Sequence, residues 1–99
     1  MARGDVVADV VNVSSSSSST VQPGSGVEWI IRAFSGDNST SSHLRSADGT
    51  SVGAICNGGE AADIGGKVTV PINNTNYVEM RNGSGSNLIL SYYGYITKD

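Results

Sequence analysis

Cysteine and histidine are nearly missing from this chain of 99 residues, which has one of each, Cys56 and His43. An internal disulfide needs two cysteines, and a structural zinc site needs several Cys or His ligands at defined spacings, so neither can stabilise the fold. The sequence places no second base or nucleophile beside either residue, as acid–base or nucleophilic catalysis would require. We therefore expect a protein that is not an enzyme and that uses no cofactor or metal.

Basic residues are also few, with six Lys and Arg against nine Asp and Glu, for a net charge of −3. They are scattered singly and form no stripe that could follow a phosphate backbone, so we expect no nucleic-acid partner. The chain lacks the run of about 18 apolar residues that a membrane helix needs. Asp5 and Asp9 interrupt the apolar stretch that a signal peptide would carry. These features predict a soluble protein made in the cytoplasm, with no membrane contact.

Large apolar side chains are scarce as well: Val, Ile, Leu and Phe make up 22 of the 99 residues, whereas Ser and Gly make up 29. A single domain of this size builds a modest core with a thin margin of stability. Because no disulfide or metal can add to that margin, association with further copies is the remaining common route. The composition therefore predicts a homo-oligomer.

What the chain does contain is a series of short strand patterns between residues 20 and 99. Alternating runs are separated by Asn, Gly and Pro, and Asp48-Gly49 has the composition of a hairpin turn. Pro71 places its strand at a sheet edge or at a strand end. The expected core face of the tryptophan-containing strand comprises its odd positions, Val27, Trp29, Ile31 and Ala33. Seven or eight short strands without a convincing helix predict an all-β fold, an antiparallel β-sandwich or barrel that is jelly-roll-like.

The N-terminal residues 1–19 differ in composition, because they end in six consecutive serines at 14–19. Residues 5–13 are rich in β-branched valine, which favours a strand, although the spacing of the valines leaves a helix open. A serine run is typical of a flexible linker. We therefore expect an N-terminal strand or arm with a Ser-rich linker over 1–19, and a β-sandwich domain over 20–99. The alternative is that the serines form a long loop between two strands of one sheet.

The last strand pattern, which starts after Asn87, is apolar or aromatic on both faces. One face carries Leu88, Leu90 and Tyr92, and the opposite face carries Ile89, Tyr93 and Tyr95. A strand with two apolar faces is usually covered on both sides, and tyrosine supplies large contact area with a polar tip. The residues that we expect at a subunit interface are Tyr92, Tyr93, Tyr95, Ile89, Val7 and Val11.

Short motifs spread over residues 20–98 resemble those of small proteins encoded among the head genes of tailed bacteriophages. The matching positions are Gln22-Pro23, Gly26, Glu28-Trp29, Asn76-Tyr77, Met80-Arg81-Asn82 and Tyr93-Gly94. The resemblance implies a capsid decoration, or cement, protein, an all-β module that trimerises. It would sit on the capsid exterior of the virion and bridge subunits of the major capsid protein.

A second hypothesis is a glycan-binding β-sandwich module of a phage fibre or of a lectin-like protein. It predicts an open groove lined by Trp29 or by the C-terminal tyrosines. Because Trp29 lies in an alternating strand, we expect it to pack in the core, with sugar stacking as the alternative. Glycan binding by the protein would distinguish this hypothesis from a structural role.

Overall fold

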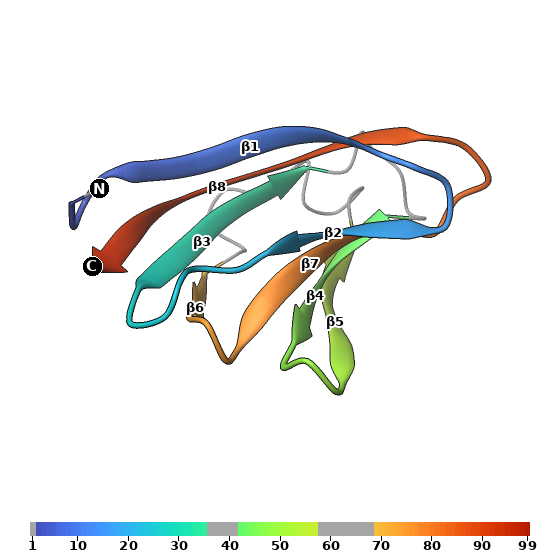
Figure 1. The fold of residues 1–99 in the computed structure, drawn as a ribbon. Coiled ribbons are helices and arrows are strands. Elements are labelled where there is room, and N and C mark those ends of the chain that lie inside the picture. Colours follow the sequence, from blue (N-terminus) through green and yellow to red (C-terminus); the bar gives the residue numbers. More distant parts are fainter. Residues whose placement is uncertain (1, 36–41, 58–68) are drawn as a thin grey trace.

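A computed structural model describes residues 2–35, 42–57 and 69–99, and these residues contain strands and connections but no helix. The eight strands are β1 (Val6–Val13), β2 (Ser17–Val21), β3 (Glu28–Ser35), β4 (Ser42–Ala47), β5 (Val52–Asn57), β6 (Val70–Ile72), β7 (Tyr77–Asn82) and β8 (Leu88–Lys98). They form two antiparallel sheets, sheet A in the order β1-β8-β3-β6 and sheet B in the order β2-β7-β4-β5 (Figure 1). The predicted all-β sandwich is confirmed, and the barrel alternative is wrong because both sheets are open.

The strand pairing is that of a jelly roll. Four antiparallel pairs nest inside one another along the chain: β1 with β8, β2 with β7, β3 with β6, and β4 with β5. Further pairing of β8 with β3 and of β7 with β4 joins these ribbons into the two sheets. Two Greek keys arranged in two sheets define this architecture.

The core lies between the central strands of the two sheets, because alternate side chains of each strand point into the sandwich. In β8 the even-numbered residues point inward, and Leu90 and Ile96 are almost completely buried. The fully buried apolar residues of the main cluster come from β3, β4, β7 and β8 and are Ile31, Phe34, Leu44, Val78, Met80 and Leu90.

A β-bulge in β3 changes which residues face the core. The pairing with β8 shifts between Ile31 and Ala33, so Arg32 is the extra residue of the bulge. Before the bulge the predicted odd face holds, since Ile31 is buried. After it Phe34 is fully buried, while Ala33 is only half-buried. The prediction that Ala33 faces the core is therefore wrong, because one extra residue reverses the alternation.

Strands β3 and β8 approach closely beside this bulge. Gly94 lies opposite Ile31, and a Cβ atom at Gly94 would collide with the backbone carbonyl of Ile30. The same Cβ would lie 3.0 Å from the Cα atom of Ile31. Only glycine fits here without a movement of the backbone.

The N-terminal segment contains the strand that its valines predict, β1, but differs from the predicted arm and linker. Strand β1 pairs with β8 of the same chain over eight residue pairs, and Ser17–Ser19 belong to β2, which pairs with β7. The serine segment therefore carries the chain from sheet A to sheet B, with Ser16 at a φ of 57° in the turn. Serine side chains bury little apolar surface, so the backbone pairing with β7 is what holds these serines in a strand. This is a correction to the expected linker, to the long-loop alternative and to the helical one.

Turn residues behave as the sequence predicts. Strands β4 and β5 form the hairpin at Asp48-Gly49, where Gly49 has a φ of 89°. Pro71 lies in β6, which is an edge strand of sheet A, so its missing N–H interrupts no central ladder. Asn73 closes the next turn, since its side-chain oxygen accepts hydrogen bonds from the N–H groups of Thr75 and Asn76.

Candidate interaction surface

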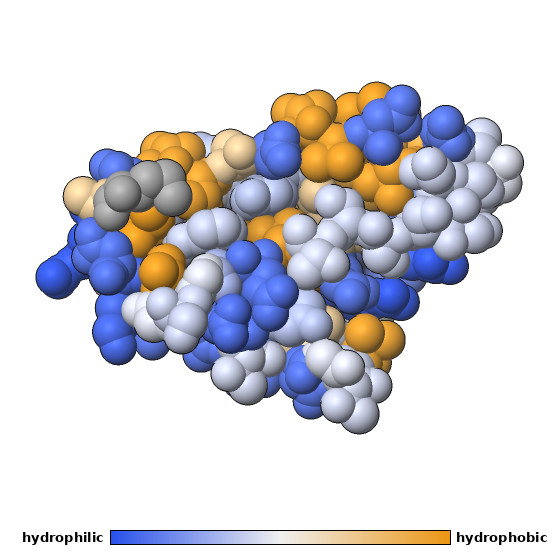
Figure 2. All heavy atoms as spheres, viewed as in Figure 1, coloured by the Kyte–Doolittle hydropathy of each residue, from blue (hydrophilic) through white to orange (hydrophobic). Residues whose placement is uncertain are grey.

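The outer face of sheet A is apolar and exposed. Three cross-strand rows on β1, β8 and β3 are Val6–Tyr95–Ile30, Ala8–Tyr93–Ala33 and Val10–Ser91–Ser35. The most exposed large side chains on it are Val6 (61%), Val10 (70%), Ile89 (47%), Tyr93 (52%) and Tyr95 (38%). Figure 2 shows hydrophobic residues gathered along the upper side of the molecule, where β1 and β8 run in Figure 1. We call this surface the apolar face.

A hollow of about 510 Å³ lies on the apolar face and is lined by Arg32, Ala33, Tyr93 and Tyr95. The bulge in β3 produces it, because the extra residue carries Arg32 outward and places the small Ala33 opposite Tyr93. Large tyrosines therefore stand next to a depression on the same surface.

Three of the predicted interface residues lie on this face, and three do not. Ile89, Tyr93 and Tyr95 are exposed together. Tyr92 points to the inner side and packs against the core, where burial, and then the nearby charge of Asp9, raises the pKa of its hydroxyl. The two remaining predicted residues, Val7 and Val11 of β1, also lie on the inner side.

The predicted valines of β1 are on the wrong side of the strand for an interface on the apolar face. Val7 is buried, and Val11 packs against the core, whereas Val6 and Val10 are exposed. Each pair consists of valines four positions apart, so both faces of the strand carry valine and the hydrophobic pattern gives little contrast between them. The register with β8 decides the matter, since Val6 lies opposite Tyr95 on the outer side.

The outer face of sheet B has a different chemistry, because its neighbouring strands carry polar and charged residues. Arg45 makes an ion pair with Glu79, in which its Nη2 atom lies 2.7 Å from Oε1. Ser18, Arg81 and His43 form an adjacent cross-strand row. Partial burial, and then the positive charges of the two arginines, lower the pKa of His43. The two outer faces of the sandwich are thus suited to different contacts.

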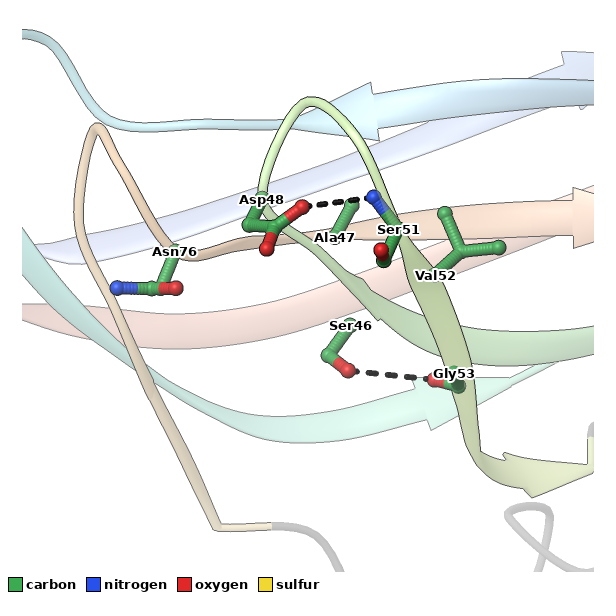
Figure 3. A pocket seen from close by; sticks show the side chains of 7 residues that line it. All are labelled: Ser46, Ala47, Asp48, Ser51, Val52, Gly53 and Asn76. Atoms are coloured by element: carbon green, nitrogen blue, oxygen red, sulfur yellow. Dashed lines mark hydrogen bonds between the residues drawn. The ribbon is translucent and has the colours of Figure 1, made fainter.

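A small pocket lies at the β4–β5 hairpin, with a volume of about 180 Å³. Figure 3 shows its lining residues, with Asp48 directed to the backbone of Ser51 and Ser46 to that of Gly53. The Asp48 carboxylate accepts hydrogen bonds from the N–H groups of Ser51 (2.7 Å) and Thr50 (2.9 Å), and these bonds lower its pKa. The polar groups of this pocket hold the turn together and leave few atoms for a ligand.

Trp29 packs against the core, as expected from its strand pattern. Its indole N–H is buried and has no hydrogen-bond partner among the described residues. This placement does not form the open aromatic groove that the glycan hypothesis requires of Trp29. Cys56 belongs to β5, but its side chain lies outside the described part of the structure.

Within the described ranges, no cluster of three or more His, Cys, Asp or Glu side chains could hold a metal ion. Those ranges also contain no helix long and apolar enough to cross a membrane. Comparison of the chain with protein-family models, with curated proteins and with solved structures found no match.

Proposed function

We propose that this protein is a structural component of a virion, which decorates the exterior of a bacteriophage capsid as a homotrimer. In this role it stabilises the capsid by bridging subunits of the major capsid protein. The observation that carries the proposal is the apolar face, because soluble domains rarely leave so continuous an apolar sheet surface in water. Such a surface is typical of proteins that work by contact with other proteins.

The residues behind the phage resemblance support the proposal through the fold. Gly94 permits the close approach of β3 and β8. Gln22 donates a hydrogen bond of 2.7 Å to the carbonyl of Asn74, and the Asn74 side chain donates one of 3.1 Å to the carbonyl of Pro23. Asn82 joins two connections at the other end of the sandwich. These matching positions therefore make contacts that hold the jelly roll together, and a substitution there would disturb the architecture.

Co-sedimentation with purified capsids that lack the protein tests this function. We expect saturable binding at a fixed number of copies per capsid, together with a higher temperature of capsid disruption. Bovine serum albumin at the same concentration serves as a control for trapping in the pellet. Absence of binding to capsids of its own phage would refute the decoration role.

A glycan-binding role has one observation in its favour, which is the hollow beside Tyr93 and Tyr95. Sugars stack on exposed aromatic rings, and Arg32 could donate hydrogen bonds to hydroxyl groups. A glycan array tests this second candidate. Binding that disappears in Tyr93→Ala would favour it over the decoration role.

A further inference from the structure

We propose that the apolar face is covered by a second copy of this chain, so that Tyr93 and Tyr95 of one copy pack into the corresponding face of the other. This inference rests on the proposed function in one respect, namely that the working form is an oligomer. It goes further by assigning the contact to one surface and one occupant.

The area of the apolar face fits a stable contact between copies. Its five most exposed large side chains together expose roughly 500 Å² to solvent. This estimate combines their exposed fractions with an area of about 150–250 Å² for an aromatic side chain. The smaller residues between them, Ala8, Asn12, Ser91 and Ala33, extend the surface. The total approaches the roughly 800 Å² per partner of a standard protein interface.

The apolar face carries both a projection and a depression. Tyr93 and Tyr95 project beside the hollow that they line together with Arg32 and Ala33. A surface that carries both a projection and a matching depression can be satisfied by another copy of itself. The Arg32 guanidinium of one copy can then stack on a tyrosine ring of the other, an arrangement that gains strength when water is excluded.

The charge distribution also favours a second copy. Along Ile89 to Tyr95 and their partner positions on the outer side of β1 and β3, Arg32 is the one side chain charged at neutral pH. Two such faces can meet with little desolvation of charge, which is the main cost of burying a sheet surface.

Strand β1 argues for contact through the face and not through the sheet edge. It is an edge strand, and the Asp9 carboxylate accepts a hydrogen bond of 2.8 Å from the backbone N–H of Val10. A charged side chain that occupies an edge N–H opposes the addition of another strand. A second copy therefore finds the apolar face open and the adjoining edge blocked.

The test uses matched substitutions of two exposed valines on edge strands. Val10 lies on the apolar face, and Val52 lies on β5 at the edge of sheet B. Sedimentation equilibrium at micromolar concentration should show an oligomeric wild type and an oligomeric Val52→Asp. Val10→Asp should have a dissociation constant at least about 100-fold higher, because the contact would bury a carboxylate without a partner. The double variant Tyr93→Ser with Tyr95→Ser should dissociate as well, and circular dichroism establishes that each variant remains folded.

A monomeric wild type would overturn the inference, and so would a Val10→Asp variant that assembles like the wild type. Equal dissociation of Val10→Asp and Val52→Asp would also overturn it, because the contact would not be specific to the apolar face. A dimer agrees with it if two apolar faces pair about a twofold axis, and a trimer agrees with it if the tyrosines of each copy enter the hollow of the next around a ring. Only the trimer agrees with the proposed stoichiometry. Capsid binding is measured separately, so an oligomer that ignores capsids refutes the proposed function and leaves the inference standing.

Discussion

Replacement of Asn82 by alanine should cost more stability than replacement of any other polar side chain among the described residues. The Asn82 side chain is fully buried at the end of β7. Its Nδ2 atom donates to the carbonyls of Val13 (2.9 Å), Ser14 (3.2 Å) and Ser86 (2.8 Å). Its Oδ1 atom accepts hydrogen bonds from the N–H (2.9 Å) and the hydroxyl (2.7 Å) of Ser84. One side chain thus ties the β1–β2 connection to the β7–β8 connection.

The expected loss for Asn82→Ala is about 3–5 kcal/mol. A typical hydrogen bond contributes about 1 kcal/mol net, and each buried polar group left without a partner costs about 1–3 kcal/mol. Several partners lose their bonds at once, although water will reach some of them. Since a domain of this size is stable by about 5–15 kcal/mol in total, the variant should be close to unfolding.

Asn82→Asp provides a second perturbation of nearly the same shape. A carboxylate has no donor for the three carbonyls that Asn82 contacts, so the charged form is disfavoured by the fold. The pKa of the new aspartate should therefore be higher in the folded than in the unfolded protein. Its stability relative to the wild type should then fall as the pH rises above about 4, the ordinary pKa of aspartate.

Urea denaturation followed by the fluorescence of the single tryptophan measures these losses. All variants are compared at one protein concentration, because the proposed association would make the measured stability depend on concentration. Asn87→Ala is the control, since Asn87 is exposed and accepts one hydrogen bond of 3.2 Å from Ser15. We expect it to cost less than about 1 kcal/mol. A loss below about 1 kcal/mol for Asn82→Ala would refute the assignment of Asn82 as the joint between these connections.

Three further predictions concern the core and the face of sheet B. Gly94→Ala should destabilise the protein by about 3 kcal/mol or more, because the added Cβ collides with the carbonyl of Ile30. Gly85→Ala is the control in the same denaturation assay and should have little effect, because open space surrounds Gly85. The lowered pKa of His43 means that the unfolded chain binds a proton more readily, so stability should fall as the pH drops below about 6.5 and through the folded-state pKa. His43→Gln should reduce this acid dependence, and an unchanged pH profile would contradict the reasoning. Trp29→Phe should cost less than about 3 kcal/mol by circular dichroism melts, because it removes ring volume but no hydrogen bond of the indole N–H, which has no partner among the described residues. A larger loss would contradict this prediction.

Local sequence patterns were sufficient for several elements of this fold. Alternation with a period of two predicted β3, and a run of apolar and aromatic residues after an Asn/Gly turn predicted β8. Asp48-Gly49 predicted the hairpin between β4 and β5. These features depend on the backbone preferences of one short segment, which the residues of that segment determine. For the same reason the sequence could predict that Tyr93 and Tyr95 share one face of β8, opposite Leu90 and Tyr92.

The serine strand and the valine strand could not be read in this way. Ser17–Ser19 become β2 because β7 lies beside them and supplies backbone hydrogen-bond partners, although serine itself has little preference for a strand. In β1 both faces carry valine, and only the register with β8 places Val6 and Val10 outside. Pairing between distant segments selected the outcome in both cases.

The sequence by itself determined that this chain forms short antiparallel strands and that its last strand is apolar on both sides. The tertiary structure alone decided where the apolar face lies, through the bulge at Arg32 and the pairing of β1 with β8. It also decided that Asn82 lies within reach of residues almost seventy positions away. The physical reason is that strand formation follows from local alternation, whereas the assignment of a face or a buried hydrogen bond depends on which distant segments the fold brings into contact.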